Sequence, residues 1–221
     1  GKALAKRAKT FRDEIESVNL QTAQTDQPVS IKITSLEFLL THYLAPYLGE
    51  GIACYPETLI ELVGTDRRVS LAYGEADLAL RFGRPQEGQL IASKILDMDF
   101  ALWNIPDAAN DTWIGLPEDL DWTPEMQLGL EHFQKPPAVR VTSFAAGRRA
   151  SFSLGLPFIA PGALIRPTDP FQKIAPAATI SREVWSVIHE TRRLDQRLAA
   201  VRQWAKNSVL KADQCKYLLD D

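Results

Sequence analysis

Two pairs of neighbouring hydroxyl side chains lie where a predicted strand is followed by a predicted helix. The pairs are Thr34-Ser35 and Thr142-Ser143. The first N–H groups of a helix have no partner within the helix, and its dipole favours negative charge at that end. Each pair could therefore bind an anion, and a cleft that brought both together would suit a small carboxylate. Serine and threonine also cap helices without any ligand, and the pattern leaves this alternative open.

The spacing of the other reactive residues supports neither catalysis nor metal binding. The three histidines, His42, His132 and His189, are widely separated and form no HExxH motif. The two cysteines, Cys54 and Cys215, form neither a disulfide framework nor a CxxC metal site. No GxSxG, GxGxxG or P-loop motif is present. We therefore expect no enzymatic activity, no metal and no cofactor.

The composition is that of an ordinary globular protein. The 221 residues are 45% hydrophobic and 24% charged, with a net charge of −3, so the bulk basicity of a free-standing nucleic-acid binder is missing. No apolar run approaches the length of a membrane span, and the N-terminus has no signal-peptide core. These features favour a cytoplasmic protein, long enough for one large or two small α/β units.

Residues 1–20 predict a helix with a short coiled-coil seam. Leu4, Ala8, Phe11, Ile15 and Val18 follow one another at alternating steps of four and three. The alternative is a solvated surface helix with an accidental apolar stripe. The sequence begins inside this pattern, which suggests a fragment of a longer protein. A polar linker over 21–28 follows.

The next segments predict a parallel sheet whose strand ends gather candidate binding residues. Strands are expected over 29–33, 58–63 and 78–82, with helices beginning at Thr34-Ser35 and over 66–74. Right-handed crossovers between parallel strands would bring the carboxyl ends of all three strands to one edge. That edge would hold Thr34-Ser35, Gly64-Thr65 and Phe82-Gly83.

Arg81 interrupts the third apolar run. It could be a guanidinium group that pairs with a ligand at the floor of a cleft, or a surface-facing residue of a partly exposed strand. We favour the second interpretation, because a buried and unpaired arginine would be costly.

The second half of the chain repeats the order of strand, hydroxyl pair and helix. Two strands are expected over 90–96 and 100–103, joined by an acidic turn over 97–99. A strand over 138–142 then leads to Ser143, which would cap a helix extending to about Leu154.

A strand over 184–188 and a closing helix over 191–207 complete the pattern. The predicted inward residues of this helix are Leu194, Leu198, Val201 and either Trp204 or Ala205.

Four segments, 44–63, 70–95, 139–162 and 183–205, resemble the effector-binding domain of LysR-type transcriptional regulators. The most specific of them is SLAYGEADLALRFGRPQEGQLIASKI, and together they span most of the chain after the linker. The coiled-coil pattern over 1–20 resembles the end of the linker helix that joins a DNA-binding winged helix-turn-helix to this domain in the family.

The resemblance implies an α/β, two-lobed fold of the type 2 periplasmic-binding-protein kind, in which each lobe is a mostly parallel sheet flanked by helices. The chain would cross between the lobes near Leu102-Trp103 and near Val184-Trp185. Lobe one would then comprise 21–102 and 184–221, and lobe two 103–183. In the family the effector binds in the cleft between the lobes, and the matching residues of this chain are Thr34, Ser35, Thr65, Phe82, Gly83, Thr142 and Ser143.

The implied function is that of a cytoplasmic sensor. A small and anionic effector would change the geometry of a homodimer or homotetramer that binds DNA through an N-terminal helix-turn-helix outside this chain. The alternative is a solute-binding receptor of a transport system, which shares the fold, although no export signal supports it. An enzyme of the same architecture has no local catalytic constellation to support it.

Overall fold

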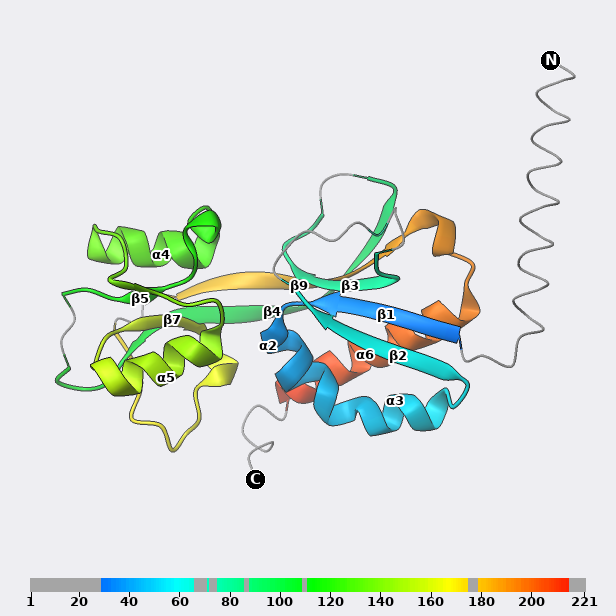
Figure 1. The fold of residues 1–221 in the computed structure, drawn as a ribbon, viewed down its shortest axis with the longest axis horizontal. Coiled ribbons are helices and arrows are strands. Elements are labelled where there is room, and N and C mark those ends of the chain that lie inside the picture. Colours follow the sequence, from blue (N-terminus) through cyan, green and yellow to red (C-terminus); the bar gives the residue numbers. More distant parts are fainter. Residues whose placement is uncertain are drawn as a thin grey trace, which may run out of the picture.

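The computed structural model describes residues 29–65, 71, 75–85, 88–108, 111–174 and 179–214 (Figure 1). The coiled-coil helix predicted over 1–20 and the linker over 21–28 lie outside the described residues. The helix predicted over 66–74 also lies outside them, apart from Leu71.

The described strands form one sheet in the order β2-β1-β3-β9-β4-β7-β5-β6, with β8 paired to β4 off this path. In chain order the strands are β1 (Val29–Ser35), β2 (Thr58–Gly64), β3 (Leu78–Phe82), β4 (Leu90–Asn104), β5 (Ile114–Gly115), β6 (Val139–Arg140), β7 (Phe158–Pro161), β8 (Gln172–Lys173) and β9 (Thr179–His189). Helices flank the sheet, so the architecture is mixed α/β, as predicted (Figure 1).

The first half of the sheet has the predicted parallel arrangement. β1 pairs in parallel with β2 on one side and with β3 on the other. The predicted strand over 78–82 is confirmed residue for residue. Ile31 and Ile33 of β1 are fully buried, because alternate residues of the strand face the same side.

A continuous helical run follows β1 and supplies much of the core of this half. It consists of α2 (Glu37–Leu39), a π-helical turn (Leu40–Leu44), a 3₁₀ turn (Ala45–Tyr47) and α3 (Leu48–Cys54). Pro46 has no N–H to donate to the carbonyl of His42, which accounts for the departure from regular α-helix at this point. The run buries Phe38, Leu39, Leu40, Tyr43, Leu44 and Tyr47.

The second half of the sheet is smaller and is covered on both faces. β5 pairs in parallel with β6 and β7. The helices α4 (Pro124–Phe133) and α5 (Phe144–Leu154) lie on opposite sides of these strands (Figure 1). Trp113 is fully buried beneath α4 and stacks on Phe133 with a centroid distance of 5.7 Å.

The long strand β4 corrects the prediction of two strands joined by an acidic turn. It runs without interruption from Leu90 to Asn104, with one bulge between Lys94 and Leu96. Asp97 and Asp99 are exposed, whereas Met98 and Phe100 are buried. The aspartates therefore occupy the solvent face of an alternating strand, and Lys94 pairs with Asp97 at 2.8 Å.

β4 and β9 form an antiparallel ribbon that joins the two halves. β9 pairs with β3 through Val184–Val187, and β4 pairs with β7 through Phe100–Trp103. Between these contacts, residues 97–99 of β4 pair with 181–183 of β9 and, within the described part of the chain, with no other strand. The division into lobes at residues 102–103 and 183–184 stays a prediction.

The closing helix α6 (Gln196–Gln214) starts later and ends later than predicted. Leu198, Val201, Trp204 and Ala205 are buried, as expected. The prediction was wrong for Leu194, which is 89% exposed. Leu194 precedes the helix. Asp195 caps the N-terminus of α6, because its carboxylate accepts a hydrogen bond from the Leu198 N–H at 2.9 Å.

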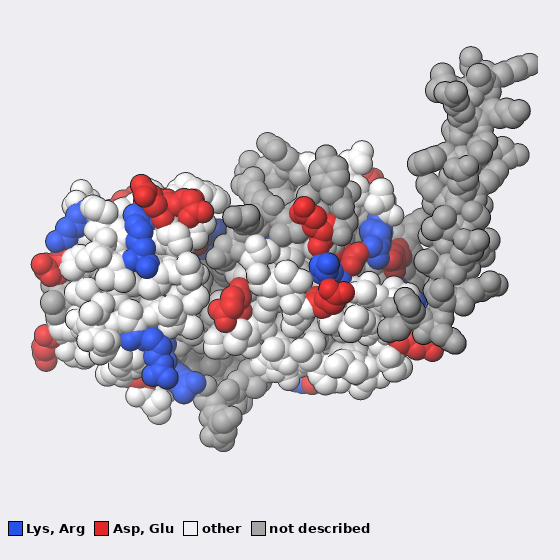
Figure 2. All heavy atoms as spheres, viewed as in Figure 1, with Lys and Arg blue, Asp and Glu red and all other residues white. Residues whose placement is uncertain are grey.

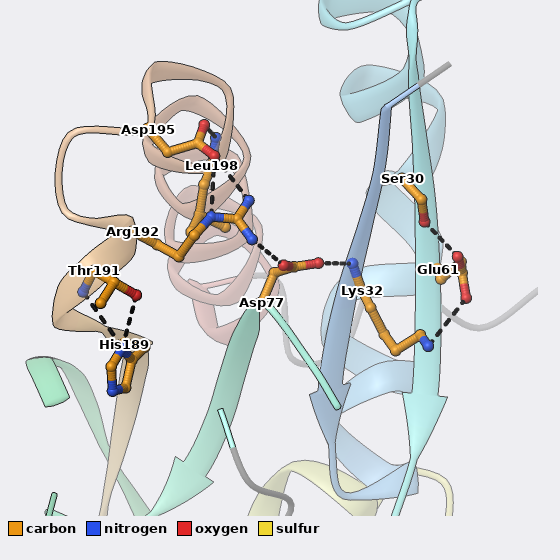
Figure 3. Close-up of polar contacts among 9 residues, drawn as sticks. All are labelled: Ser30, Lys32, Glu61, Asp77, His189, Thr191, Arg192, Asp195 and Leu198. Atoms are coloured by element: carbon orange, nitrogen blue, oxygen red, sulfur yellow. Dashed lines mark hydrogen bonds and ion pairs between the residues drawn. The ribbon is translucent and has the colours of Figure 1, made fainter. Parts of the chain in front are cut away.

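A polar cluster ties α6 to the opening strands of the first half (Figure 3). Asp77, just before β3, accepts a bond from the Lys32 N–H of β1 at 2.8 Å and pairs with Arg192. Arg192 also pairs with Asp195 at 2.8 Å. Short 3₁₀ turns complete the described structure at Glu118–Leu120, Gly162–Leu164 and Glu190–Arg192.

Candidate functional site

The helices α2 and α5, which belong to different halves of the sheet, approach each other (Figure 1). A small hollow is lined by residues of both halves at this place. One wall is Leu36, Glu37 and Phe38, the residues that follow β1. The other wall comes from the second half of the sheet and consists of Leu116, Leu120, Thr142, Ser143 and Phe144. The two halves thus contribute to one site, which we call the interlobe hollow.

A chain of aromatic rings begins with Phe38 and Phe144, which line the interlobe hollow, and continues into the sheet. Phe38 meets Phe144 edge to face at a centroid distance of 6.0 Å, and Phe144 in turn meets Phe100 at 5.5 Å. Phe100 contacts Phe82 of β3 at 5.2 Å. Each such pair typically contributes about 0.5–1.5 kcal/mol beyond the burial of its area. The rings therefore help to hold the two halves together.

The interlobe hollow is too small for a metabolite in this arrangement. Its cavity volume is about 30 Å³, whereas pockets for small organic ligands typically measure about 300–1,000 Å³. A ligand larger than a few water molecules would have to separate Phe38 from Phe144.

The pair Thr142-Ser143 lies in the wall of the interlobe hollow. Ser143 has extended backbone dihedrals and caps α5, because its side-chain oxygen accepts a bond from the Ala146 N–H at 3.2 Å. The predicted cap is confirmed. The participation of Thr142 and Ser143 in effector binding stays a prediction.

The prediction that Thr34-Ser35 opens a helix was wrong. Both residues belong to β1 and are buried, with exposed fractions of 1% and 0%. The Ser35 hydroxyl donates to the Leu80 carbonyl at 3.0 Å. The helical run starts two residues later, and its N-cap, Leu36, makes no side-chain capping bond. Neither hydroxyl lines the interlobe hollow.

Arg81 also differs from its interpretation as a surface-facing residue. Its side chain is partly buried and donates to the Thr34 hydroxyl at 2.8 Å and to the Leu80 carbonyl at 3.2 Å. The guanidinium group thus binds β1 to β3 from the buried side. The cost of its burial is offset by these hydrogen bonds, which an isolated strand pattern does not reveal.

The three other predicted residues lie at the same sheet edge but outside the lining of the interlobe hollow. The Thr65 N–H donates to the Ser35 carbonyl at 2.9 Å, and the Gly83 N–H donates to the Glu183 carbonyl at 2.8 Å. Gly83 has a φ of +79°, which favours glycine at this turn. Phe82 belongs to the aromatic chain. The backbone groups of Thr65 and Gly83 are therefore engaged within the sheet.

The sequence interpretation missed most of the lining. Leu36, Glu37, Phe38 and Phe144 directly follow the two hydroxyl pairs, so the sequence indicates their position but not their part in the lining. Leu116 and Leu120 come from a loop that carried no binding signal. Glu37 is exposed and accepts a bond from the Thr41 hydroxyl at 2.9 Å. It places a negative charge beside the hollow.

Arg140 fixes the loop that forms the far wall. Its guanidinium group binds both oxygens of Asp121, at 2.8 and 2.9 Å, and the Leu116 carbonyl at 2.7 Å. Hydrogen bonding to Asp121 raises the pKa of Arg140 above its ordinary value. This bidentate arrangement positions Leu116 and Leu120 against the hollow.

A buried ion pair links α4 to the ribbon that joins the halves. Glu125 of α4 pairs with Arg182 of β9, and Arg182 also lies over the Phe82 ring at 5.5 Å from its centroid. Glu125 is 4% exposed, and burial lowers the pKa of Arg182. Removing one partner of such a pair leaves an uncompensated buried charge, so the pair fixes α4 on the ribbon.

Other classes of site find no support within the described part of the chain. No group of three or more histidine, cysteine, aspartate or glutamate residues there could hold a metal ion. None of the described helices has the length and hydropathy needed to cross a membrane. Acidic and basic side chains are interspersed on the face shown in Figure 2, where the described residues form no broad patch of either sign.

The sequence comparison identifies a regulatory relative. No family model matches the sequence. The chain is 31% identical over 121 residues to the Mau operon transcriptional activator of Paracoccus denitrificans. This match covers 53% of the chain and only 43% of the relative.

The structural comparison gives broader coverage. The regulatory domain of CrgA, a LysR-type transcriptional regulator from Neisseria meningitidis, matches with a TM-score of 0.66 and 16% identity, covering 81% of this chain and 98% of that domain. The effector domain of the transcriptional regulator AmpR of Pseudomonas aeruginosa matches with a TM-score of 0.62 and 16% identity, covering 85% and 98%. At these identities the matches establish the fold.

Proposed function

We propose that this chain, which has the fold of the regulatory domain of LysR-type transcriptional regulators, senses a small effector that binds between its two lobes. It would act as part of a cytoplasmic homodimer or homotetramer that binds DNA through a helix-turn-helix outside this chain and catalyses no reaction. The proposed lobes are 21–102 with 184–221, and 103–183, preceded by a linker helix over 1–20. The observation that carries the proposal is the interlobe hollow, whose two walls come from different halves of the sheet.

The position of the hollow supports a switch. An effector changes a conformational equilibrium only if it binds the two conformations with different affinities. The contact between Phe38 and Phe144 closes the hollow, so a metabolite-sized effector would favour an arrangement in which these rings are further apart. Binding would then be coupled to the relative position of the lobes, and through them to the oligomer on DNA.

The walls also indicate the chemistry of the effector. The capped start of α5 at Ser143 is a favourable place for a carboxylate, since α5 has no acidic residue in its first turn. Glu37 on the opposite wall favours a hydrogen-bond donor such as an amine or hydroxyl group. Leu36, Leu116 and Leu120 favour a short apolar part. We therefore propose a small carboxylate that also carries a donor group.

Release of the effector from the native protein is the first experiment. Protein purified from its own cells is denatured, and the small molecules released are identified by mass spectrometry. We expect a carboxylate, which is then titrated calorimetrically into the purified chain. If only cationic molecules bind, the assignment of a carboxylate to α5 is wrong.

Two variants and a matched control locate the binding site. We expect Thr142→Val and Glu37→Gln each to weaken binding roughly tenfold, the value of one lost hydrogen bond to a charged group. Thr168→Val is the control, because Thr168 is exposed and lies outside the lining of the hollow. Unchanged affinity in both cleft variants would show that the effector binds elsewhere.

A further inference from the structure

A second and larger hollow lies in the first half of the molecule, between α6 and the ribbon of β4 and β9. Its volume is about 330 Å³, at the lower end of the range of about 300–1,000 Å³ typical of ligand pockets. We call it the α6 hollow. Its lining consists of Ile91 and Ser93 of β4, Ile188 of β9, Arg193, and Ala199, Arg202, Gln203 and Lys206 of α6. None of these residues lines the interlobe hollow.

The charge of the α6 hollow has one sign. Arg193, Arg202 and Lys206 contribute three cations, and the lining contains no carboxylate. Arg202 and Lys206 are four residues apart on one face of α6, where like charges repel each other. Lys206 donates to the neutral Ser93 hydroxyl at 3.3 Å, and no ion pair of Lys206 is formed within the described part of the chain. An anion in the hollow would relieve this repulsion.

Arg202 is the most constrained of the three cations. Its Nε donates to the Ser186 hydroxyl at 3.1 Å, and its Nη2 donates to the carbonyls of Ser186 and Ile91 at 3.2 and 3.4 Å. All these acceptors are neutral, and burial lowers the pKa of Arg202. The guanidinium group is therefore oriented and partly desolvated without an opposite charge among the described residues. A guanidinium group that is already oriented and partly desolvated binds an anion at a lower cost than a mobile and solvated surface side chain does.

Three other partly buried arginines show a contrast, whereas Arg81 binds the neutral Thr34 hydroxyl and Leu80 carbonyl described above. Arg140 binds Asp121, Arg148 binds Asp169, and Arg182 binds Glu125. Each of these guanidinium groups has a carboxylate from its own chain. Among the described residues the α6 hollow instead gathers cations around an open volume.

We infer that the α6 hollow binds a small organic anion, with its carboxylate or phosphate group toward Arg193, Arg202 and Lys206 and a short apolar part toward Ile91 and Ile188. The anion complements the three cations, and the two isoleucines with Ala199 provide the apolar wall. This site is separate from the proposed effector site and depends on different residues.

Calorimetric titrations of the purified chain at low ionic strength test the ligand class. Benzoate and phenyl phosphate are the organic anions, inorganic phosphate lacks the apolar part, and phenol lacks the charge. We expect one or both organic anions to bind at least roughly tenfold more tightly than inorganic phosphate or phenol, since each lacks one of the two kinds of contact. If inorganic phosphate binds as tightly as the organic anions, the proposed contact with the apolar wall is wrong. If phenol binds as tightly as they do, the proposed anion site is wrong.

Variants of α6 test the location. We expect the double substitution Arg193→Gln with Lys206→Gln to weaken binding of the organic anion at least roughly tenfold. The matched control is Arg197→Gln, which removes an exposed cation of α6 outside the lining and should change the affinity less than about twofold. An equal loss in both proteins would mean that the effect is general electrostatic attraction, and the site would be refuted.

A third variant separates this inference from the proposed function. Thr142→Val alters the interlobe hollow and should leave binding of benzoate or phenyl phosphate at the α6 hollow unchanged. If Thr142→Val abolishes binding and the double α6 variant does not, the anion occupies the interlobe hollow and the inference is wrong. Circular dichroism spectra of all variants, matched to those of the wild type, exclude loss of folding as the cause.

Discussion

The two hydroxyl pairs occupy equivalent places in the sequence but different places in the structure. Thr34-Ser35 is the buried end of β1, and its hydroxyls bind Arg81 and the Leu80 carbonyl within the sheet. Thr142-Ser143 follows β6, and there Ser143 caps a helix beside the interlobe hollow. The same residue types therefore stabilise a sheet at one junction and begin a helix at the other.

The length of the preceding strand explains this difference. β1 has seven residues and carries its hydroxyl pair as its last two, whereas β6 has only two residues and ends before Thr142. β1 also has two parallel neighbours, of which β3 pairs as far as Thr34 and β2 as far as Ser35. A hydroxyl at a strand end is thus available to a ligand only where the neighbouring strands stop first.

The largest effect that would test this comparison is expected for Thr34→Val. Valine keeps the shape of threonine but cannot accept the bond from Arg81, so a partly buried guanidinium group loses one of its acceptors. We expect a decrease in the free energy of unfolding of about 2 kcal/mol. Urea denaturation followed by circular dichroism measures it, with Thr168→Val as an exposed control. A decrease no larger than that of the control would show that the bond to Arg81 does not stabilise the fold.

The second largest effect is expected for Ser35→Ala. The substitution removes a hydrogen bond between two neutral groups, the Ser35 hydroxyl and the Leu80 carbonyl, in a fully buried environment. We expect the protein to lose about 1.5 kcal/mol of stability in the same urea assay. Ser35→Thr would keep the hydroxyl but add a methyl group in the core, so it should also destabilise the protein, by overpacking. Stability equal to the wild type in Ser35→Ala would mean that the first junction tolerates loss of its hydroxyl.

A smaller effect is expected at the second junction for Ser143→Ala. The loss of the bond to the Ala146 N–H should cost about 1 kcal/mol, the usual contribution of a helix cap. Amide hydrogen exchange of the first turn of α5 should accelerate, while exchange in β1 should not. Ser143→Asp retains an acceptor and adds a charge that the helix dipole favours, so it should restore stability. Failure of this rescue would show that the hydroxyl acts otherwise than as a cap.

The parts of the fold that local patterns specify were predictable. β1, β2 and β3 are apolar and bounded by turn residues, and their parallel orientation in one sheet was predicted. β4 was not, because Asp97 and Asp99 indicate a turn when read alone. Only the pairing with β9 shows that they lie on the exposed face of a continuous strand. The prediction that Leu194 is buried was wrong for a similar reason, because the start of α6 depends on the cap that Asp195 provides.

The candidate site was less predictable than the fold. The position of Thr142 and Ser143 beside a hollow followed from the order of the elements. Leu116 and Leu120 could not be found in this way, because they reach the hollow only through the packing of the second half against α2. No sequence motif indicates the α6 hollow, because its cations belong to a helix and to the turn before it and come together only in the folded chain.

The smallest effect on stability is expected for Thr142→Val, and this variant separates folding from binding most clearly. Thr142 is exposed beside the interlobe hollow, and β6 has already ended when the chain reaches it. Its replacement should change the free energy of unfolding by less than about 0.5 kcal/mol. The same substitution is expected to weaken binding of the effector. A loss of affinity without a loss of stability would therefore show that the Thr142 hydroxyl binds the effector and does not stabilise the fold. A loss of stability as large as that of Thr34→Val would instead show that Thr142 stabilises the fold as Thr34 does. The distinction between a structural hydroxyl pair and a binding hydroxyl pair would then be wrong.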